Sequence, residues 1–224
     1  MSNPLTKIIQ REQKNYPGRT LPAIFFLGFL RKIKNKYVNT RMAMTKDSTF
    51  LTEDSLWMCS LFPKKILDVI IQERHPLSVL DVGSGTGVSL KYMLDKGIEA
   101  TGLENSAKAI KKSIVKDHII RHNLNKEINL NKKFDLTWCF EVIEHIHPDF
   151  ENTFLNTLVN HSDYIILSAA RPGQGGHGHF NEKEPSYWID KFAQLGYIYD
   201  LEFTRRLTKT GEMHAENILC FYKS

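Results

Sequence analysis

From Pro76 to the C-terminus, short apolar runs alternate with segments of helical pattern. Runs of β-branched, aliphatic and aromatic residues that end in turn residues are typical of strands covered on both faces. They predict seven strands, at 77–82, 98–104, 118–123, 134–140, 163–169, 197–203 and 216–222.

Helices are predicted between several of these strands. They cover 86–96, 106–116, a segment that begins near Pro148, and a segment from Pro185 to Gly196. Proline at the start of a helix and glycine just past its end are the expected punctuation. The alternation predicts an α/β fold, a Rossmann-like, doubly wound and mostly parallel sheet. The short segment TKTGE (208–212) before the last strand indicates a tight hairpin, so this strand is expected to be antiparallel.

Length and composition fit one main soluble domain, since the 224 residues are 42% hydrophobic and 25% charged. The longest apolar run, 21–30, is too short to span a membrane, and its basic flank RKIKNK does not resemble a signal-peptide cleavage site. A cytoplasmic protein is therefore expected. Cys59, Cys139 and Cys220 lie in apolar contexts, which favours buried thiols over a disulfide or cysteine–zinc framework.

Positive charge is concentrated near the N-terminus. Residues 1–46 hold ten Lys or Arg and one acid, a net charge of +9, whereas the remaining residues carry −4. We therefore divide the chain into a basic helical extension or cap at 1–50 and a catalytic domain at 51–224. The extension is interpreted as a solvated basic face; the alternatives are a surface for an anionic substrate, for the inner membrane surface, or for nucleic acid.

Three glycines follow the first strand in SVLDVGSGTG. Gly83, Gly85 and Gly87 leave no side chains between the backbone and a bound polar ligand. Glu104 ends the next strand, where a carboxylate can accept hydrogen bonds from two ribose hydroxyls. The Gly-x-Gly-x-Gly spacing differs from the dinucleotide pattern Gly-x-Gly-x-x-Gly, because position 88 is Val. A nucleotide-dependent oxidoreductase is therefore the second hypothesis, and a non-catalytic partner protein on this fold is the third.

The run from Asp81 to Gly87 resembles the first motif of class I S-adenosylmethionine-dependent methyltransferases. This resemblance implies S-adenosylmethionine as cofactor and Glu104 as the acid that holds its ribose. It also implies that Asn123, at a position where the family usually has Asp, and Leu124 flank the adenine. The expected cofactor-binding residues are Asp81, Gly83, Ser84, Gly85, Gly87, Glu104, Asn123, Leu124 and Glu141.

The segment EVIEHI (141–146) brings two acids and a histidine together after the fourth strand. A helical turn there would aim Glu141 and His145 into one cleft. The segment is similar to the Glu-x-x-Glu-His segment of methyltransferases that act on quinone-precursor phenols, the ubiquinone-biosynthesis branch, and on the terminal ribose of small RNAs. Some of these hold a divalent metal. That resemblance would make Glu141, Glu144 and His145 ligands, with His179 as a fourth, although a site without metal is the interpretation adopted here.

A glycine-rich segment, 173–188, follows the fifth strand and is interpreted as a lid over the cofactor's methyl group. It carries His179, which with His145 and Glu144 completes the set of expected catalytic residues. A neutral imidazole can take the proton of a hydroxyl acceptor. The predicted function is O-methylation of a small-molecule or glycan hydroxyl, and the alternative within the family is a metal-dependent RNA ribose methyltransferase. The sequence does not indicate an oligomeric state.

Overall fold

The computed structural model describes residues 20, 22–23, 29–30, 61–176 and 178–224. Of the first fifty residues, 22–23 and 29–30 are described as helical. The rest of the predicted basic extension lies outside the described residues, and so do Cys59 and His177. The division of the chain at residue 50 therefore stays a prediction.

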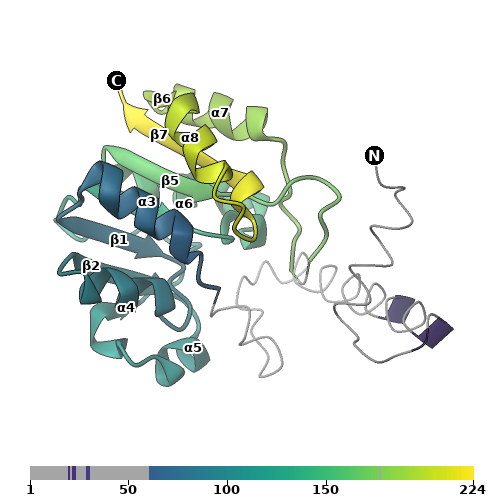
Figure 1. Cartoon of the computed structure of the whole chain (residues 1–224), viewed down its shortest axis with the longest axis horizontal. Coiled ribbons are helices and arrows are strands. Elements are labelled where there is room, and N and C mark those ends of the chain that lie inside the picture. Colours follow the sequence, from purple (N-terminus) through teal and green to yellow (C-terminus); the bar gives the residue numbers. More distant parts are fainter. Residues whose placement is uncertain (1–19, 21, 24–28, 31–60, 177) are drawn as a thin grey trace.

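Seven strands form a single sheet in the order β3-β2-β1-β4-β5-β7-β6 (Figure 1). All neighbouring strands from β3 to β5 pair in parallel, whereas β7 is antiparallel to both β5 and β6. The predicted seven-stranded, mostly parallel sheet with an antiparallel last strand is confirmed. The strands are β1 Ser78–Val82, β2 Glu99–Glu104, β3 Ile119–Arg121, β4 Leu136–Cys139, β5 Tyr164–Ser168, β6 Tyr197–Tyr199 and β7 Ile218–Lys223.

Helices cover both faces of this sheet (Figure 1). On one face α3, α4 and α8 bury side chains against β1, β4 and β7, and on the other face α6 and α7 do the same. The α-helices are α3 Lys64–Arg74, α4 Val88–Asp95, α5 Ala107–Lys112, α6 Glu151–His161, α7 Pro185–Gln194 and α8 Leu201–Thr208. Short 3-10 turns are η2 Lys116–His118, η3 Ile143–His145, η4 Pro148–Phe150 and η5 Ala215–Asn217. This is the doubly wound arrangement expected.

The tight hairpin predicted before the last strand is wrong, because α8 lies between β6 and β7. The apolar run at 197–203 ends as a strand at Tyr199. Asp200 then accepts a hydrogen bond from the backbone N–H of Phe203 at 2.9 Å and so caps the new helix. Buried Phe203 and Leu207 are four residues apart, a helical spacing that the strand-like residues before them obscured.

Helix α3 was not predicted, although it completes one face of the core. Arg74 at its end ties it to α8 and β5: its guanidinium lies 4.0 Å from the ring centre of Tyr164 and 4.3 Å from that of Phe203. The same group forms an ion pair with Asp200. One side chain therefore joins the start of the domain to its C-terminal elements.

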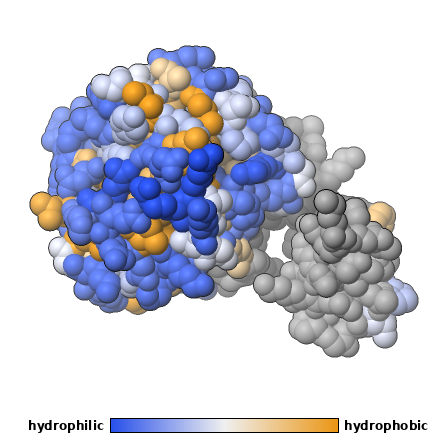
Figure 2. All heavy atoms as spheres, turned by 45° about the horizontal axis from the view of Figure 1, so that its top comes forward, coloured by the Kyte–Doolittle hydropathy of each residue, from blue (hydrophilic) through white to orange (hydrophobic). Residues whose placement is uncertain are grey.

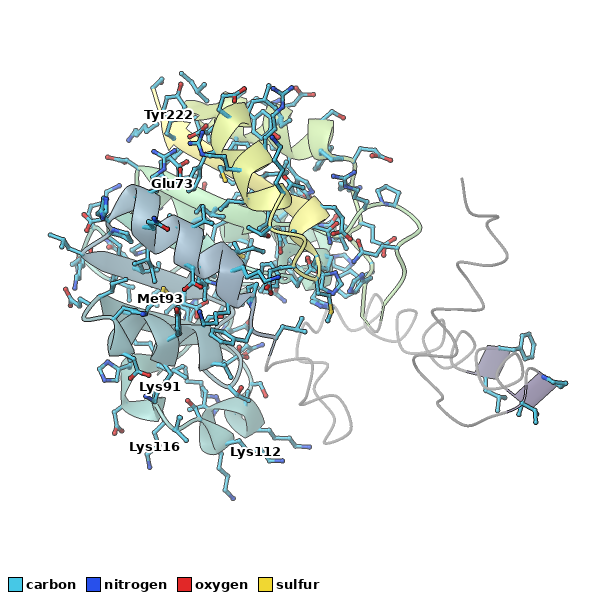
Figure 3. All side chains as sticks on the ribbon, viewed as in Figure 1. Glu73, Lys91, Met93, Lys112, Lys116 and Tyr222 are labelled. Carbon is cyan, nitrogen blue, oxygen red and sulfur yellow. The ribbon has the colours of Figure 1, made fainter. Side chains whose placement is uncertain are left out.

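Exposed apolar side chains are scattered over the described domain. Figure 2 shows a largely hydrophilic face with small apolar areas, and the most exposed examples, Leu77, Ile114 and Met213, come from separate loops. Lys112 and Lys116, labelled in Figure 3, extend outward at the α5 end of the sheet. Among the described residues, no helix has both the length and the apolar character to cross a membrane.

Gly102 on β2 provides a test of how tightly this part of the fold is packed. It pairs with Asp81, and a Cβ atom added to it would lie 2.7 Å from Oγ of Ser84 and 3.1 Å from Cδ2 of Leu90. We expect Gly102→Ala to lower the free energy of unfolding by about 1–3 kcal/mol, because the turn must move aside. Thr101→Ala, the adjacent control, should cost less in the same denaturant titration; equal losses would contradict the prediction.

Candidate active site

The glycine-rich turn after β1 has the left-handed backbone that only glycine adopts without strain. The φ angles of Gly83, Gly85 and Gly87 are 81°, 58° and 77°. The N–H groups of Gly83 and Ser84 donate to the carbonyl of Leu103 at 2.8 and 3.1 Å. The turn is thereby fixed to the end of β2, at the edge where the parallel strands end.

Glu104 is bound to this turn by its side chain. Its carboxylate accepts hydrogen bonds from the N–H of Gly85 at 2.8 Å and of Ser106 at 2.6 Å. Burial raises the pKa of Glu104, and the hydrogen bonds from the Ser106 and Gly85 backbone oppose that rise. The structure therefore brings the predicted ribose-binding acid and the glycine turn together.

Asp81 and Ser84 lie buried beside the turn with polar atoms that have no partner among the described residues. These atoms are Oδ2 of Asp81 and Oγ of Ser84. Burial, reinforced by the charge of Glu104, raises the pKa of Asp81 to about 8. Such groups are expected where a polar or cationic ligand binds.

The predicted adenine-flanking residues follow β3 at the same edge of the sheet. Leu124 is buried, and Oδ1 of Asn123 accepts a hydrogen bond from the N–H of Asn125 at 3.0 Å. The N–H of His122 donates to the carbonyl of Glu104 at 2.9 Å, which joins this segment to the ribose side. The predicted adenine-side and ribose-side residues are thus neighbours in the fold.

A second cluster lies after β4 and comprises Glu144, His145 and His179, called here the Glu144 cluster. One potential ligand atom from each of the three lies within 4.8 Å of the others. The Nε2 atom of His179 is 4.0 Å from Oε1 of Glu144, and the two imidazole centres are 4.8 Å apart. The structure therefore brings together all three residues predicted to be catalytic.

Backbone hydrogen bonds hold the glycine-rich loop against this cluster. The N–H groups of Phe180 and Asn181 donate to the carbonyl of Glu144 at 3.2 and 3.1 Å. The imidazole Nδ1 of His145 is 3.0 Å from the carbonyl oxygen of Gly178. The segment predicted as a lid thus lies closed over η3 here, with its residues 178–181 fixed to the turn that carries His145.

The hydrogen bonds of the two imidazoles define where their hydrogens lie. Nδ1 of His145 faces a carbonyl oxygen, and Nδ1 of His179 faces Oε1 of Glu182 at 3.1 Å. Both Nδ1 atoms must therefore donate, which makes Nε2 the basic nitrogen of each neutral ring. Burial lowers the pKa of His179, which favours the neutral form.

Glu144 is fully buried, and neither of its carboxylate oxygens has a hydrogen-bond partner among the described residues. Burial raises its pKa well above the usual range, and the nearby charge of Glu141 adds to this effect. Histidines that donate from Nδ1 to a carbonyl or carboxylate are also the usual form of metal-binding histidine. The donor set of the Glu144 cluster therefore fits a divalent cation.

Glu141 and His145 do not lie on one helical turn, which corrects the expectation from the sequence. It has a left-handed backbone with φ 56°, and the 3-10 turn begins only at Ile143. Its Oε2 atom lies 3.2 Å from Nδ1 of His214, and its Oε1 atom accepts a hydrogen bond from Asn217 at 3.0 Å. His214 and Asn217 were missed because their place at this edge depends on the antiparallel direction of β7.

Comparison with known families identifies the domain. A family model described as a methyltransferase domain matches residues 58–195, which is more than half of the chain. The chain belongs to this methyltransferase family. Its cofactor is S-adenosylmethionine, and the oxidoreductase and non-catalytic hypotheses are wrong.

A curated relative and several solved structures resemble this methyltransferase. The ubiquinone biosynthesis O-methyltransferase of Azoarcus sp. (strain BH72) is 27% identical over 140 residues, 58% of this chain and 54% of that protein. The chain thus spans about half the length of this relative. The methyltransferase domain of bacterial CtHen1-C has a TM-score of 0.54 at 18% identity, with 72% of this chain and 98% of that chain covered.

A further solved structure supports the fold of this methyltransferase. The 1,6-didemethyltoxoflavin-N1-methyltransferase of Burkholderia thailandensis has a TM-score of 0.57 at 14% identity, and the match covers 79% of this chain and 84% of that chain. It was crystallised with S-adenosylhomocysteine. At these identities the likeness shows the fold, whereas the acceptor has to be argued from the site.

The role of Glu104 can be tested by cofactor binding. Glu104→Ala removes the carboxylate that braces Gly85 and is expected to hold the ribose. We expect the affinity for S-adenosylhomocysteine, measured by calorimetry, to fall about 10- to 100-fold through lost charge-assisted hydrogen bonds. Glu99→Ala on the same strand, where Glu99 forms a surface ion pair with Lys132, is the matched control. Equal affinity in the two variants would remove Glu104 from the cofactor site.

Asp81 provides a pH-dependent test of stability. Its folded-state pKa of about 8 lies above the ordinary value of 3.8, so the stability linked to it is present at acid pH and is lost as the pH rises through 8. Asp81→Asn has no proton to lose. We therefore expect the difference in free energy of unfolding between Asp81→Asn and the native chain to change in favour of the variant by at least about 1 kcal/mol from pH 5 to pH 8. Urea titrations without ligand measure this difference. Parallel pH profiles of the two proteins would contradict this.

Proposed function

We propose that this enzyme transfers the methyl group of S-adenosylmethionine to a hydroxyl group of a small molecule or glycan. The observation that carries the proposal is the Glu144 cluster, which places two basic imidazole nitrogens and a carboxyl group at the end of β4. The name of the Azoarcus relative, an O-methyltransferase, agrees with a hydroxyl acceptor.

The geometry divides the site into a cofactor side and an acceptor side. The glycine-rich turn follows β1 and Glu104 ends β2, whereas Glu144 and His145 lie on η3 after β4 and His179 lies on the loop after β5. A Cβ atom on Gly83 would lie 2.4 Å from a side-chain carbon of Val142, so the two sides meet at Val142. An acceptor held over the Glu144 cluster would therefore lie beside the bound cofactor.

Positioning supplies much of the rate in this chemistry. The sulfonium group already activates the methyl group, so the protein must hold the acceptor oxygen in line with the carbon–sulfur bond and exclude water. The hydroxyl proton must leave as the new bond forms. The basic Nε2 atom of His145 is the group we assign to accept it, and His179 on the closed loop helps to hold the acceptor.

A divalent cation held by Glu144, His145 and His179 would instead lower the pKa of the acceptor hydroxyl directly. The buried carboxylate oxygens of Glu144, which lack partners among the described residues, favour this second version. This second version is also compatible with an RNA ribose acceptor, because that hydroxyl is poorly acidic and the small RNA methyltransferase HEN1 shares the fold. The basic segment 1–46 would then be the surface for the anionic acceptor or for a membrane, a role that stays a proposal.

The base and the cation can be separated by a kinetic experiment. The acceptor panel is a catechol, a simple glycoside and a short RNA with a free 3′ ribose, and release of S-adenosylhomocysteine is measured. His145→Ala should lower kcat about 10²- to 10⁴-fold with cofactor affinity nearly unchanged. His179→Ala should also raise the KM of the acceptor, because the loop takes part in binding. His118→Ala, at an exposed position, is the control.

Adding a chelator to the same assay decides between the base and the cation. If EDTA leaves turnover intact, His145 acts as the base; if EDTA abolishes turnover and Mg²⁺ or Mn²⁺ restores it, the cation version holds. If neither histidine variant is impaired, the acceptor is an amine or carboxylate that needs no base, and the O-methylation proposal is wrong.

A further inference from the structure

A second group of polar side chains adjoins the Glu144 cluster and has no part in the mechanism above. It consists of Glu141 after β4, Gln174 in the glycine-rich loop, and His214 and Asn217 before β7. The Nδ2 atom of Asn217 donates to Oε1 of Glu141 and to Oε1 of Gln174, both at 3.0 Å. One amide thus joins three segments that are far apart in the sequence.

The orientation of this amide follows from its partners. Both neighbours of Asn217 Nδ2 are oxygens, and one belongs to a carboxylate. The reverse orientation would place the amide oxygen against that carboxylate, so it is excluded by repulsion. Nδ1 of His214 lies 3.2 Å from the other oxygen of Glu141 and 3.4 Å from Nε2 of Gln174, and the tautomer with hydrogen on Nδ1 donates to the closer carboxylate oxygen. Both carboxylate oxygens of Glu141 are therefore held by residues of the C-terminal segment.

This arrangement is energetically unfavourable in three respects. Glu141 and His214 adopt left-handed backbone conformations, with φ 56° and 64°, although neither is glycine. Asn217 is buried, and its Oδ1 atom has no hydrogen-bond partner among the described residues. An apolar residue of the same size would avoid the cost of that oxygen. Unfavourable features that gather at one place are typical of a functional constraint.

The loop segment that Asn217 contacts is joined to the Glu144 cluster by hydrogen bonds. The N–H groups of Gly173 and Gly175, on either side of Gln174, donate to the carboxylate of Glu182 at 2.9 and 2.8 Å, and Oε1 of Glu182 lies 3.1 Å from Nδ1 of His179. Glu141 itself lies three residues before Glu144. The N–H of Glu141 donates to Oγ of Ser168 at 2.6 Å, so its backbone is fixed to the end of β5. Only the side chain remains to be oriented, and Asn217 and His214 orient it.

We propose that Asn217 is a positioning residue for methyl transfer. Its amide holds the Glu141 carboxylate and the base of the glycine-rich loop in the orientation that the Glu144 cluster requires. His214 is the second positioning residue of the same carboxylate. The proposal rests on methyltransferase activity, and it does not depend on which hydroxyl is methylated.

The decisive variant is Asn217→Leu, which keeps the size of the side chain and removes both the donor and the oxygen without a partner. The largely buried Glu141 carboxylate loses one of its donors in this variant, so the melting temperature should fall by a few degrees. With a purely structural role, the fall in melting temperature would be the whole effect, and the folded variant would turn over normally. Turnover with the best acceptor of the panel should instead fall about 10- to 100-fold, because a misplaced site reacts slowly. Affinity for S-adenosylhomocysteine should remain within about threefold.

A second measurement needs no acceptor. In full-length protein with ¹⁵N-labelled histidine, the imidazole resonances of His214 and His179 report the hydrogen bonds and charge supplied by Glu141. We expect the resonances of both histidines to shift in Asn217→Leu. In Glu141→Gln, which removes the charge, the resonance of His179 should shift in the same direction as in Asn217→Leu. Thr157→Val is the matched control, because Thr157 is buried and its hydroxyl donates to the carbonyl of Thr153 within α6.

Two further variants keep the test decisive. His214→Asn tolerates the left-handed backbone and sits at a partly exposed position, so it should fold even if Asn217→Leu does not. It should lower turnover in the same way. In a double-mutant cycle, Asn217→Leu should cost little once Glu141 has been replaced by Gln, because both changes remove one interaction.

The outcomes separate this proposal from the proposed function. Unchanged imidazole spectra in Asn217→Leu, or additive effects in the cycle, would overturn the positioning role whatever the acceptor. Absence of methyl transfer to every hydroxyl of the panel would overturn O-methylation, while shifted spectra would still support the positioning of Glu141.

Discussion

The hydrogen bonds between the glycine-rich turn and the end of β2 are the constraint on which the rest of the site depends. They extend the pairing of β1 and β2 beyond the strands, from the N–H groups of Gly83 and Ser84 to the carbonyl of Leu103. Glu104 continues the contact through its side chain. Because the turn is fixed in this way, its backbone is presented to the cofactor in one conformation, and α4 begins directly after it.

Buried carboxyl groups gather at this edge of the sheet. Asp81, Glu104 and Glu144 all have pKa values raised by burial, which means that the ionised form of each is less favourable in the folded protein than in solvent. A fold retains such groups where a ligand compensates for them. S-adenosylmethionine carries positive charge on its sulfonium and amino groups, which suits the acids near the glycine turn. In the function proposed above, the imidazoles, or a cation between them and Glu144, would serve the same purpose on the acceptor side.

The antiparallel strand β7 brings the C-terminal segment into the site. Its pairing places Ile218 opposite Ser168 at the end of β5, so the residues just before β7 lie at the edge where the parallel strands end. A parallel last strand would have carried His214 and Asn217 to the opposite edge. The reversal of one strand therefore supplies both partners of Glu141.

The sequence by itself determined the seven strands, helices α4 to α7, the cofactor family and the residues that follow β1, β2 and β4. These features are local, because a glycine-rich turn, an apolar run and a Glu-x-x-Glu-His segment are each formed by residues adjacent in the chain. Helix α8 was missed because its apolar residues also fit a strand until Asp200 caps the helix. The tertiary structure alone decided that His179 lies against Glu144 and that the side chain of Glu141 contacts His214. Those pairings join segments more than thirty residues apart, and their side-chain directions follow from strand register and loop path, which no local pattern encodes.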